Sequence, residues 1–198
     1  MIIWINGAFG SGKTTVAYEL NRRLADSFVY DPENAGFFIR KNLPEAFSSG
    51  DFQDIELWRE MNYRILKSLY SQYSGTVIVP MTLVNPDYYN EIVGKLIAEG
   101  IAVRHFILYA SREEIKRRLS KRSFHIPGRE RFAVDAIERC VNAFDTVITE
   151  EKIDTEHINA DEITEKIAEM CGLQLIQEKK TRFQKAVYRF KIWMKHIR

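Results

Sequence analysis

The sequence predicts an α/β fold in which a five-stranded parallel sheet is flanked by helices. Short apolar runs alternate along the chain with longer segments of helical periodicity, as they do when crossover helices connect parallel strands. The first apolar run leads directly into a glycine-rich turn and then a helix, which is typical of a phosphate-binding α/β domain. With 198 residues, the chain is long enough for one domain with a sizeable core.

The glycine-rich turn matches the phosphate-binding loop (P-loop) pattern G-x-x-x-x-G-K-[ST] at every fixed position. We expect residues 2–6 to form a buried strand before it and a helix to begin near Lys13. Glycines let the backbone aim successive N–H groups at a polyphosphate, Lys13 would bridge its β- and γ-phosphates, and the Thr14 hydroxyl would ligate Mg²⁺. The sequence therefore predicts a P-loop NTPase that binds a nucleoside triphosphate. The predicted cofactor-binding residues are Gly7, Ala8, Phe9, Gly10, Ser11, Gly12, Lys13, Thr14 and Thr15.

The remaining elements follow in order from periodicity and from turn residues. The loop helix runs to about residue 25, and a short strand at 28–30 stops at Asp31 because Pro32 cannot continue a ladder. Residues 33–54 mix turn residues with aromatics, which indicates short helices. We expect longer helices at 57–73, 86–99, 111–122, 133–144, 159–169 and 179–197, and strands at 76–80, 103–109 and within 146–158.

Sequence signals at the ends of three of these helices support their boundaries. Asn85-Pro86 reads as an N-cap followed by the first helical residue. Ser111 with Glu114, and Asn159 with Glu162, have the spacing of capping boxes, in which each side chain satisfies a backbone N–H of the other residue.

Asp31 is the first candidate for chemistry outside the loop. Ligands of such folds gather at the carboxyl ends of the strands, and Asp31 lies beside the P-loop if the two strands are near neighbours. Its carboxylate could accept a proton from a substrate hydroxyl or hold magnesium through water. The alternative is an ordinary turn aspartate before proline.

Basic residues provide the next candidates. Arg118 and Arg122 lie one turn apart on a helix that the stretch 123–128 interrupts, so they could close over a transferring phosphate as part of a small lid at about 118–132. A solvated helix face is the alternative, because other Lys and Arg residues crowd the same stretch. Arg40, Arg59 and Asn62 stand beside aromatic residues, which suits binding of a ring-bearing substrate.

The charge of the chain is unevenly divided. The net charge is +2, but residues 178–198 carry +7 and residues 1–177 carry −5. We expect residues 1–177 to form the kinase-like P-loop domain and residues 178–198 a basic amphipathic helix. The apolar positions of that helix recur at spacings of four and three. It would lie on an anionic membrane surface or pack on the domain or a second copy; a nucleic-acid role lacks any reading motif. Its apolar stripe consists of Phe183, Val187, Phe190, Met194 and Ile197.

The cysteines and the hydropathy pattern bear on location. Cys140 and Cys171 have no C-x-x-C spacing, which favours reduced thiols in a cytoplasmic protein and suggests no zinc site. There is no apolar run of about 18 residues, and we expect no signal peptide because the first strand leads straight into the P-loop. We therefore expect a cytoplasmic protein, with the basic helix as the part that could reach the inner face of the membrane.

Several of these stretches together resemble the tunicamycin-resistance ATP-binding proteins, within the nucleoside-monophosphate-kinase branch of P-loop proteins. The resemblance implies ATP binding, a site for a uridine-containing lipophilic antibiotic such as tunicamycin, and resistance to that antibiotic. It also favours Asp31 as base or metal partner, and Thr82 joins the predicted substrate-binding residues. The matching stretches are 1–14 (MIIWINGAFGSGKT), 29–33 (VYDPE), 51–62 (DFQDIELWREMN), 78–82 (IVPMT), 89–96 and the pair Arg139-Cys140.

One departure from nucleotide kinases matters for mechanism. Many of them place an aspartate after the third strand, whereas this chain reads Pro80-Met81-Thr82 there. Any second carboxylate near the metal must come from elsewhere, and Asp31 is the obvious candidate. Two function classes therefore stay open: a phosphotransferase, which could also be a small-metabolite or nucleotide kinase, and an ATP-dependent binder that sequesters its ligand. The oligomeric state is open as well.

Overall fold

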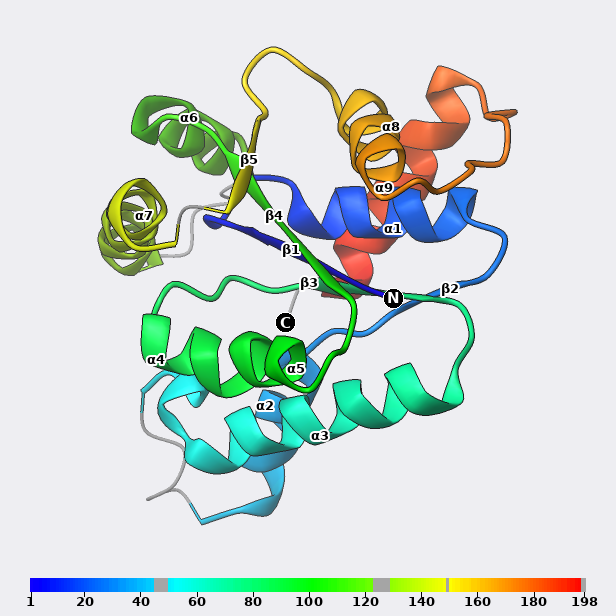
Figure 1. The fold of residues 1–198 in the computed structure, drawn as a ribbon. Coiled ribbons are helices and arrows are strands. Elements are labelled where there is room, and N and C mark those ends of the chain that lie inside the picture. The colour runs from blue at the N-terminus through cyan, green and yellow to red at the C-terminus, as the bar shows by residue number, and fades with distance from the viewer. Residues whose placement is uncertain (45–49, 123–128, 149, 197–198) are drawn as a thin grey trace.

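The computed structural model describes residues 1–44, 50–122, 129–148 and 150–196, except the side chains of 121, 122, 129–136, 193, 195 and 196. Within this part of the chain, five strands form one parallel sheet in the order β2-β3-β1-β4-β5, so the predicted sheet is confirmed (Figure 1). The first strand lies at the centre of the sheet. The strands are β1 (Ile2–Gly7), β2 (Ser27–Val29), β3 (Thr76–Pro80), β4 (Val103–Tyr109) and β5 (Glu151–Asp154).

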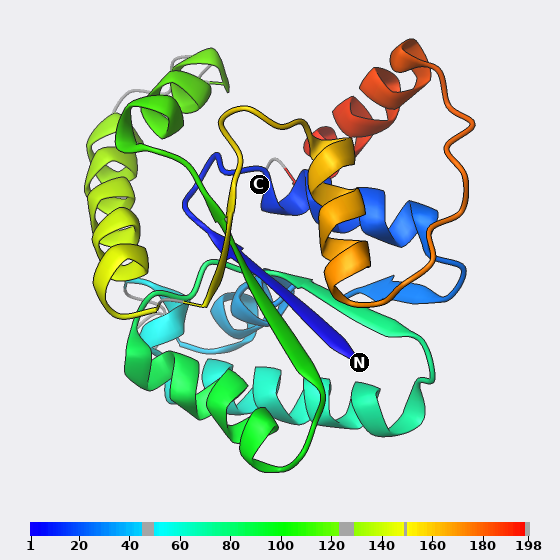
Figure 2. The same ribbon diagram turned by 45° about the horizontal axis from the view of Figure 1, so that its top comes forward.

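Helices cover both faces of the sheet. Figures 1 and 2 show α1 and α8 on one face and α3, α4 and α5 on the other, with α6 and α7 beside the end of the sheet where β1 runs into the P-loop. The helices are α1 (Lys13–Arg23), α2 (Glu33–Asn42), α3 (Glu56–Gln72), α4 (Pro86–Tyr89), α5 (Lys95–Ala98), α6 (Arg112–Arg122), α7 (Arg129–Thr146), α8 (Ala160–Met170) and α9 (Arg182–His196); η2 (Phe52–Asp54) is a 3-10 turn and η3 (Asn90–Gly94) a π-helical segment.

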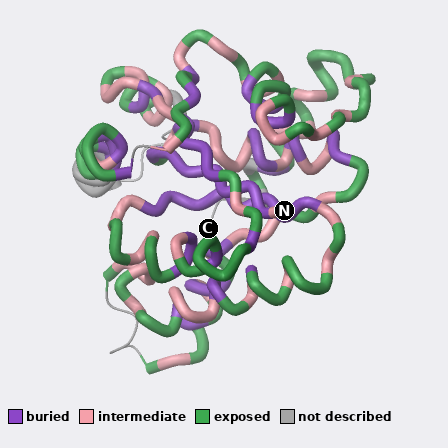
Figure 3. Tube along the Cα trace, viewed as in Figure 1, coloured by how far each residue is buried: buried purple, intermediate pink, exposed green. Residues whose placement is uncertain are grey.

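The central strand shows why the apolar runs have no alternation. Successive residues of β1 point to opposite faces, and both faces are buried. Ile3 and Ile5 pack against α1 and α8, whereas Ile2 and Trp4 pack against α3 and the segment η3–α5. The buried residues accordingly trace the strands through the middle of the molecule (Figure 3).

Two expectations about the helices need correction. The predicted helix at 86–99 is interrupted by η3, a wider turn beside which Ile92, Val93 and Leu96 are all fully buried. The sequence also predicts an apolar stripe of Trp58, Met61, Ile65 and Leu69 along α3, and the buried face of this helix is displaced from it. Trp58 is buried as expected, but Asn62 and Leu66 complete the buried face because the helix packs along the 58-62-66 row.

The predicted caps are formed at two helices and only half formed at a third. Asn85 caps α4, and Asn159 with Glu162 forms a complete capping box. At α6 only half of the predicted box is present. The Ser111 hydroxyl accepts a weak hydrogen bond from the Glu114 N–H at 3.4 Å, whereas the Ser111 N–H donates to Glu156 instead of Glu114.

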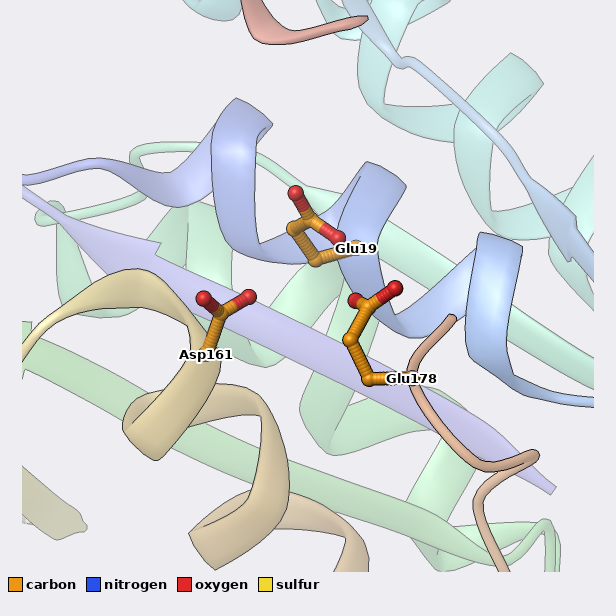
Figure 4. Close-up of side chains that lie close together, drawn as sticks. All are labelled: Glu19, Asp161 and Glu178. Atoms are coloured by element: carbon orange, nitrogen blue, oxygen red, sulfur yellow. The ribbon is translucent and has the colours of Figure 1, made fainter. Parts of the chain in front are cut away.

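The C-terminal helix α9 is attached to the domain through charge. Glu19 of α1, Asp161 of α8 and Glu178 lie together with their carboxylates converging (Figure 4). Three cations satisfy these acids, so the group is an ion-pair network that fastens α9 to α1 and α8. Its pairs are Arg22–Glu19, Arg22–Glu178, Lys185–Asp161, Lys185–Glu178, Arg189–Glu19 and Arg189–Asp161.

The docked helix turns the described part of its apolar stripe away from the domain; Ile197, the last residue of the predicted stripe, lies outside the described residues. Lys185, Tyr188, Arg189 and Ile192 face inward, and Tyr188 donates a hydrogen bond to the carbonyl of Tyr18. The residues on the opposite side stay exposed, although they are the hydrophobic ones. Exposure is 77% for Phe183, 38% for Val187, 58% for Phe190 and 54% for Met194. Packing of this stripe onto the domain, one of the expected alternatives, is therefore not what the structure has. None of the described helices has the length and hydropathy needed to span a bilayer.

Candidate functional site: a phosphate-binding loop and its surroundings

The P-loop joins β1 to α1 and is built on three glycines with positive φ. The φ angles are 143° at Gly7, 84° at Gly10 and 100° at Gly12, a region that side chains with a Cβ rarely enter. Gly12 is the N-cap of α1, so the loop ends at the positive end of a helix dipole. Consecutive N–H groups held in such a turn form an anion-binding concavity. The loop has the backbone that a polyphosphate needs.

Two glycines are also required by close packing. A Cβ on Gly7 would lie 2.6 Å from Ser11 Oγ and 2.7 Å from the Leu108 carbonyl oxygen, so no other residue fits there. A Cβ on Gly10 would meet the side chain of Leu119 at 3.2 Å. This second approach brings the P-loop against α6, whose residues 118–122 begin the predicted lid.

Lys13 and Ser11 show how the loop satisfies its polar groups. Lys13 Nζ donates hydrogen bonds to the carbonyl oxygens of Gly7 at 2.9 Å and Ala8 at 3.0 Å, and lies 5.7 Å from the centre of the Phe9 ring. The Ser11 hydroxyl is buried with no hydrogen-bond partner among the described residues. Buried polar groups are rarely left unsatisfied, so an unpaired hydroxyl inside the loop fits a site that takes up a polar ligand.

The loop is fastened to the segment that follows β3. Asn6 exchanges two hydrogen bonds with the backbone of Leu83: its Nδ2 donates to the carbonyl at 2.7 Å, and its Oδ1 accepts from the N–H at 3.0 Å. Thr82 Oγ1 donates to the Gly7 carbonyl oxygen at 2.8 Å, the same oxygen that Lys13 contacts. The predicted substrate residue Thr82 is thus joined directly to the P-loop, although its side chain is buried.

Asp31 follows β2, which is the second strand from β1 in the sheet. Strand β3 lies between β1 and β2, so these two strands are near neighbours without being adjacent. Two strand spacings amount to about 10 Å, which a bound substrate can bridge. Asp31 Oδ1 accepts a hydrogen bond from the Glu33 N–H at 3.0 Å at the start of α2. The carboxylate is partly exposed at the carboxyl edge of the sheet.

Arg118 makes contacts that compete with a catalytic role. Its Nε donates to Glu114 at 2.7 Å, its Nη1 to Thr155 Oγ1 at 3.0 Å and its Nη2 to the Thr155 carbonyl at 2.6 Å. Hydrogen bonds from Arg117 and then Arg118 lower the pKa of Glu114 to about 2. In this arrangement Arg118 joins α6 to the segment after β5, and contact with a phosphate requires it to exchange partners.

The rest of the predicted lid is described only in part. Arg122 ends α6, but its side chain and residues 123–128 lie outside the described part of the chain. The placement of Arg122 relative to the loop, and the lid at about 118–132, therefore stay predictions.

The predicted substrate-binding residues on α2 and α3 differ in their surroundings. Arg40 donates to the Gly50 carbonyl at 2.7 Å and lies over the Phe52 ring. Arg59 donates to Glu91 at 2.5 Å and to the Gln53 carbonyl at 2.7 Å, with its guanidinium 4.4 Å from the centre of the Tyr88 ring. Arg40 thus contacts Gly50, and Arg59 contacts Gln53 within its own segment. We call residues 50–59 the acceptor segment, because substrate binding is predicted here.

Asn62 is engaged inside the fold. It is fully buried, its Oδ1 accepts from the Tyr30 hydroxyl at 2.7 Å, and its Nδ2 donates to the Trp58 carbonyl at 2.7 Å. Burial raises the pKa of Tyr30, so this hydroxyl stays protonated and can donate the bond. Asn62 fixes the residue before Asp31, and direct contact with a substrate would require these bonds to break.

Sequence reasoning missed Gln53, which links the acceptor segment to the P-loop. Gln53 Nε2 donates to the Thr82 carbonyl at 3.2 Å, and Thr82 in turn contacts Gly7. Gln53 lies in the stretch 51–62, which carries part of the family resemblance but no motif that marks this residue. A bond between residues 29 positions apart has no periodic signal in the sequence, so its position alone could not reveal it.

The comparisons with known proteins agree with this geometry. Residues 2–147 match the AAA domain family model. The chain is similar to the structure of the tunicamycin resistance protein of Deinococcus radiodurans, with 31% identity, coverage of 89% of this chain and 98% of that chain, and a TM-score of 0.75. No curated protein matches the chain.

Two further solved structures share the fold at lower identity. A sugar kinase from Janibacter has 16% identity over 87% of this chain and 94% of its own, with a TM-score of 0.61. Shikimate kinase from Bacteroides thetaiotaomicron has 16% identity over 87% and 99%, with a TM-score of 0.58. The fold is that of P-loop kinase-like, nucleotide-binding proteins.

Proposed function

Because the chain belongs to the AAA domain family and to the family of the tunicamycin resistance protein, we propose that it transfers the γ-phosphoryl group of ATP to a hydroxyl of a nucleoside-type small molecule such as tunicamycin. The observation that carries this proposal is the shared contact at Gly7. Lys13 of the P-loop and Thr82 after β3 both donate a hydrogen bond to its carbonyl oxygen. The residue that would bind the nucleotide and the residue that would bind the acceptor therefore contact the same oxygen atom.

The P-loop residues fit ATP with Mg²⁺. Backbone N–H groups between Gly7 and Thr15 would hold the phosphates, and Lys13 would leave its two loop carbonyls to contact the β- and γ-phosphates. Thr14 stands in the first turn of α1, where its hydroxyl is a suitable magnesium ligand. When bound, the metal would neutralise charge on the phosphates.

On the acceptor side, Asp31 would take the proton of the attacking hydroxyl. As the new O–P bond forms and the bond between the β- and γ-phosphates breaks, that proton passes to the carboxylate and ADP is released. Arg118 and Arg122 would stabilise the charge on the transferring group once the lid closes, which for Arg118 means leaving Thr155. Arg40 and Arg59 would orient the acceptor segment over the ligand.

Two other outcomes belong to the same site. The protein could hold tunicamycin with ATP and never transfer phosphate, which needs the P-loop but no base. It could also phosphorylate a small metabolite or nucleotide. The exposed aromatic ring of Phe9, in the P-loop itself, favours an acceptor with apolar or ring surface.

We also propose that the protein is cytoplasmic and reaches the inner face of the membrane through α9. The exposed stripe of Phe183, Phe190 and Met194 points away from the domain, and the exposed cations Arg182 and Lys191 flank it. An apolar face between cations is the arrangement of an interfacial helix on anionic lipid.

Titration calorimetry tests the ligand assignment. Tunicamycin is titrated into the wild-type protein saturated with a non-hydrolysable ATP analogue and Mg²⁺, and into the protein without nucleotide. We expect tight binding only with the analogue present, because the bound nucleotide completes the site. Absence of tunicamycin binding in both cases would exclude this ligand and leave the metabolite-kinase reading.

A further inference from the structure

Asp51 lies in the acceptor segment at a position that sequence reasoning did not assign to the site. It is the N-cap of η2, and its Oδ1 accepts a hydrogen bond from the Gln53 N–H at 3.1 Å. The side chain is partly exposed. The backbone of Gln53 thus orients one oxygen of the carboxylate, and the side chain of Gln53 fixes where the segment sits.

A short chain of hydrogen bonds joins Asp51 to the P-loop lysine. Gln53 donates to the Thr82 carbonyl at 3.2 Å, and Thr82 donates to the Gly7 carbonyl oxygen at 2.8 Å. That oxygen also accepts from Lys13 Nζ at 2.9 Å. Two consecutive bonds therefore hold the short turn that carries Asp51 against the base of the P-loop, and the Lys13 ammonium contacts the oxygen at which they end.

Asp51 is a carboxylate held close to the segment that follows β3. Residues 80–82 offer no carboxylate, and Asp31 lies beyond β3 at the end of the edge strand β2. Asp51 reaches the neighbourhood of Thr82 through Gln53 rather than through the strand itself.

We propose that Asp51 is a second acceptor-side carboxylate, which binds the small molecule by accepting a hydrogen bond from one of its hydroxyl or N–H groups. The proposal rests on the proposed function, because it assumes a ligand on this side of the P-loop. An ionised carboxylate only accepts, so it selects ligands with donors, such as the hydroxyls of a sugar. It differs from Asp31 in purpose: Asp51 holds the acceptor in place, and Asp31 takes its proton.

The Asp51→Asn variant separates charge from capping. Asparagine caps a helical turn as well as aspartate does, so η2 and the Gln53 contact are kept while the charge is lost. Calorimetry with tunicamycin and the non-hydrolysable ATP analogue should then show at least about tenfold weaker tunicamycin binding, since a hydrogen bond to a charged group becomes an ordinary one. The affinity for the ATP analogue alone should be unchanged.

Matched variants make the result decisive. Asp87→Asn makes the same substitution at an exposed carboxylate in the first turn of α4, outside the acceptor segment, and should bind tunicamycin as the wild type does. Asp51→Ala loses the cap as well, so a purely structural role would appear as a lower Tm in Asp51→Ala with normal tunicamycin binding by Asp51→Asn. Wild-type affinity in Asp51→Asn would overturn the role of Asp51 alone. Failure of the wild type itself to bind tunicamycin would overturn the proposed ligand and, with it, this inference.

Discussion

Lys13 is the residue on which nucleotide binding should depend most directly. In Lys13→Ala, we expect ATP affinity to fall by at least about 100-fold, because the only side-chain cation of the P-loop is lost, while the fold persists. Calorimetric titration of ATP with Mg²⁺ measures the change, and circular dichroism checks the fold. Lys41→Ala, on the exposed end of α2, is the matched control. Unchanged ATP affinity in Lys13→Ala would remove the nucleotide site from this loop.

Asp31 should affect turnover far more than nucleotide binding. Asparagine keeps the hydrogen bond to the Glu33 N–H but cannot take a proton, so Asp31→Asn should lower kcat by about 100-fold or more. The ATP affinity should change little. Steady-state kinetics with tunicamycin as acceptor provides the measurement. Full turnover in this variant would leave Asp31 as the turn residue that its position before Pro32 also allows.

Some residues of the site could be predicted from the sequence and others could not. The P-loop glycines and Lys13 could be predicted because their spacing is local and each has one physical reason. Asn6, Gln53 and Thr82 act through hydrogen bonds to residues 29 to 77 positions away, and such bonds depend on where the fold brings backbone groups. Their part in joining the two sides of the site was therefore not predictable.

At the scale of elements, the attachment of α9 should depend on pH through Glu178. Burial alone would raise the pKa of this carboxyl, but hydrogen bonds, first from Arg22 and then from the Lys180 N–H, lower it to about 2 from its ordinary 4.5. A depressed pKa in the folded state means that the stabilisation is complete above pH 4.5. It is lost as the pH falls from about 4.5 to about 2.

Hydrogen exchange of the backbone amides of α9 measures how firmly the helix is attached. Protection should be constant from pH 7 to about 5 and then decline, after correction for the intrinsic exchange rate. In Glu178→Gln, protection at pH 7 should already be reduced, and its difference from the wild type should narrow toward pH 2. An equal difference at pH 7 and pH 3 would show that the charge of Glu178 does not hold the helix.

Removal of α9 tests the membrane proposal. A protein lacking residues 178–198 should lose binding to anionic vesicles but keep ATP binding, because each cation near the surface contributes about 1 kcal/mol and the apolar stripe adds burial. Vesicle flotation with and without anionic lipid measures this, and the attachment of the full chain should weaken with salt. If the full chain does not float and the truncated chain aggregates, α9 is structural or covers a second copy.

The structure shows which face of α9 meets the domain. Periodicity predicted an amphipathic helix correctly, but not which face would meet the domain. That choice depends on Glu19, which is fully buried, and on the ion pair that Arg189 forms with it. A buried acid on α1 draws the basic side of α9 inward, so the apolar side is left outside.

At the scale of the molecule, the alternation of strands and helices predicted a parallel sheet and its five members. The order of the strands was not predictable from local pattern, and the insertion of β3 between β1 and β2 places one strand between Asp31 and the strand that leads into the P-loop. The order also places the segments after β1 and β3 side by side, which is why Thr82 and Lys13 meet at Gly7. The nucleotide side was predicted from a motif, and the acceptor side depends on this topology.

The most direct test of the account is whether tunicamycin is changed by the protein. Purified protein is incubated with ATP, Mg²⁺ and tunicamycin, and the antibiotic is then analysed by mass spectrometry, with Lys13→Ala as the control. We predict that the wild type yields tunicamycin carrying one added phosphoryl group, together with an equal amount of ADP, and that Lys13→Ala yields neither. Unmodified tunicamycin recovered from wild-type protein that demonstrably binds both ATP and the antibiotic would contradict phosphoryl transfer and identify sequestration as the function.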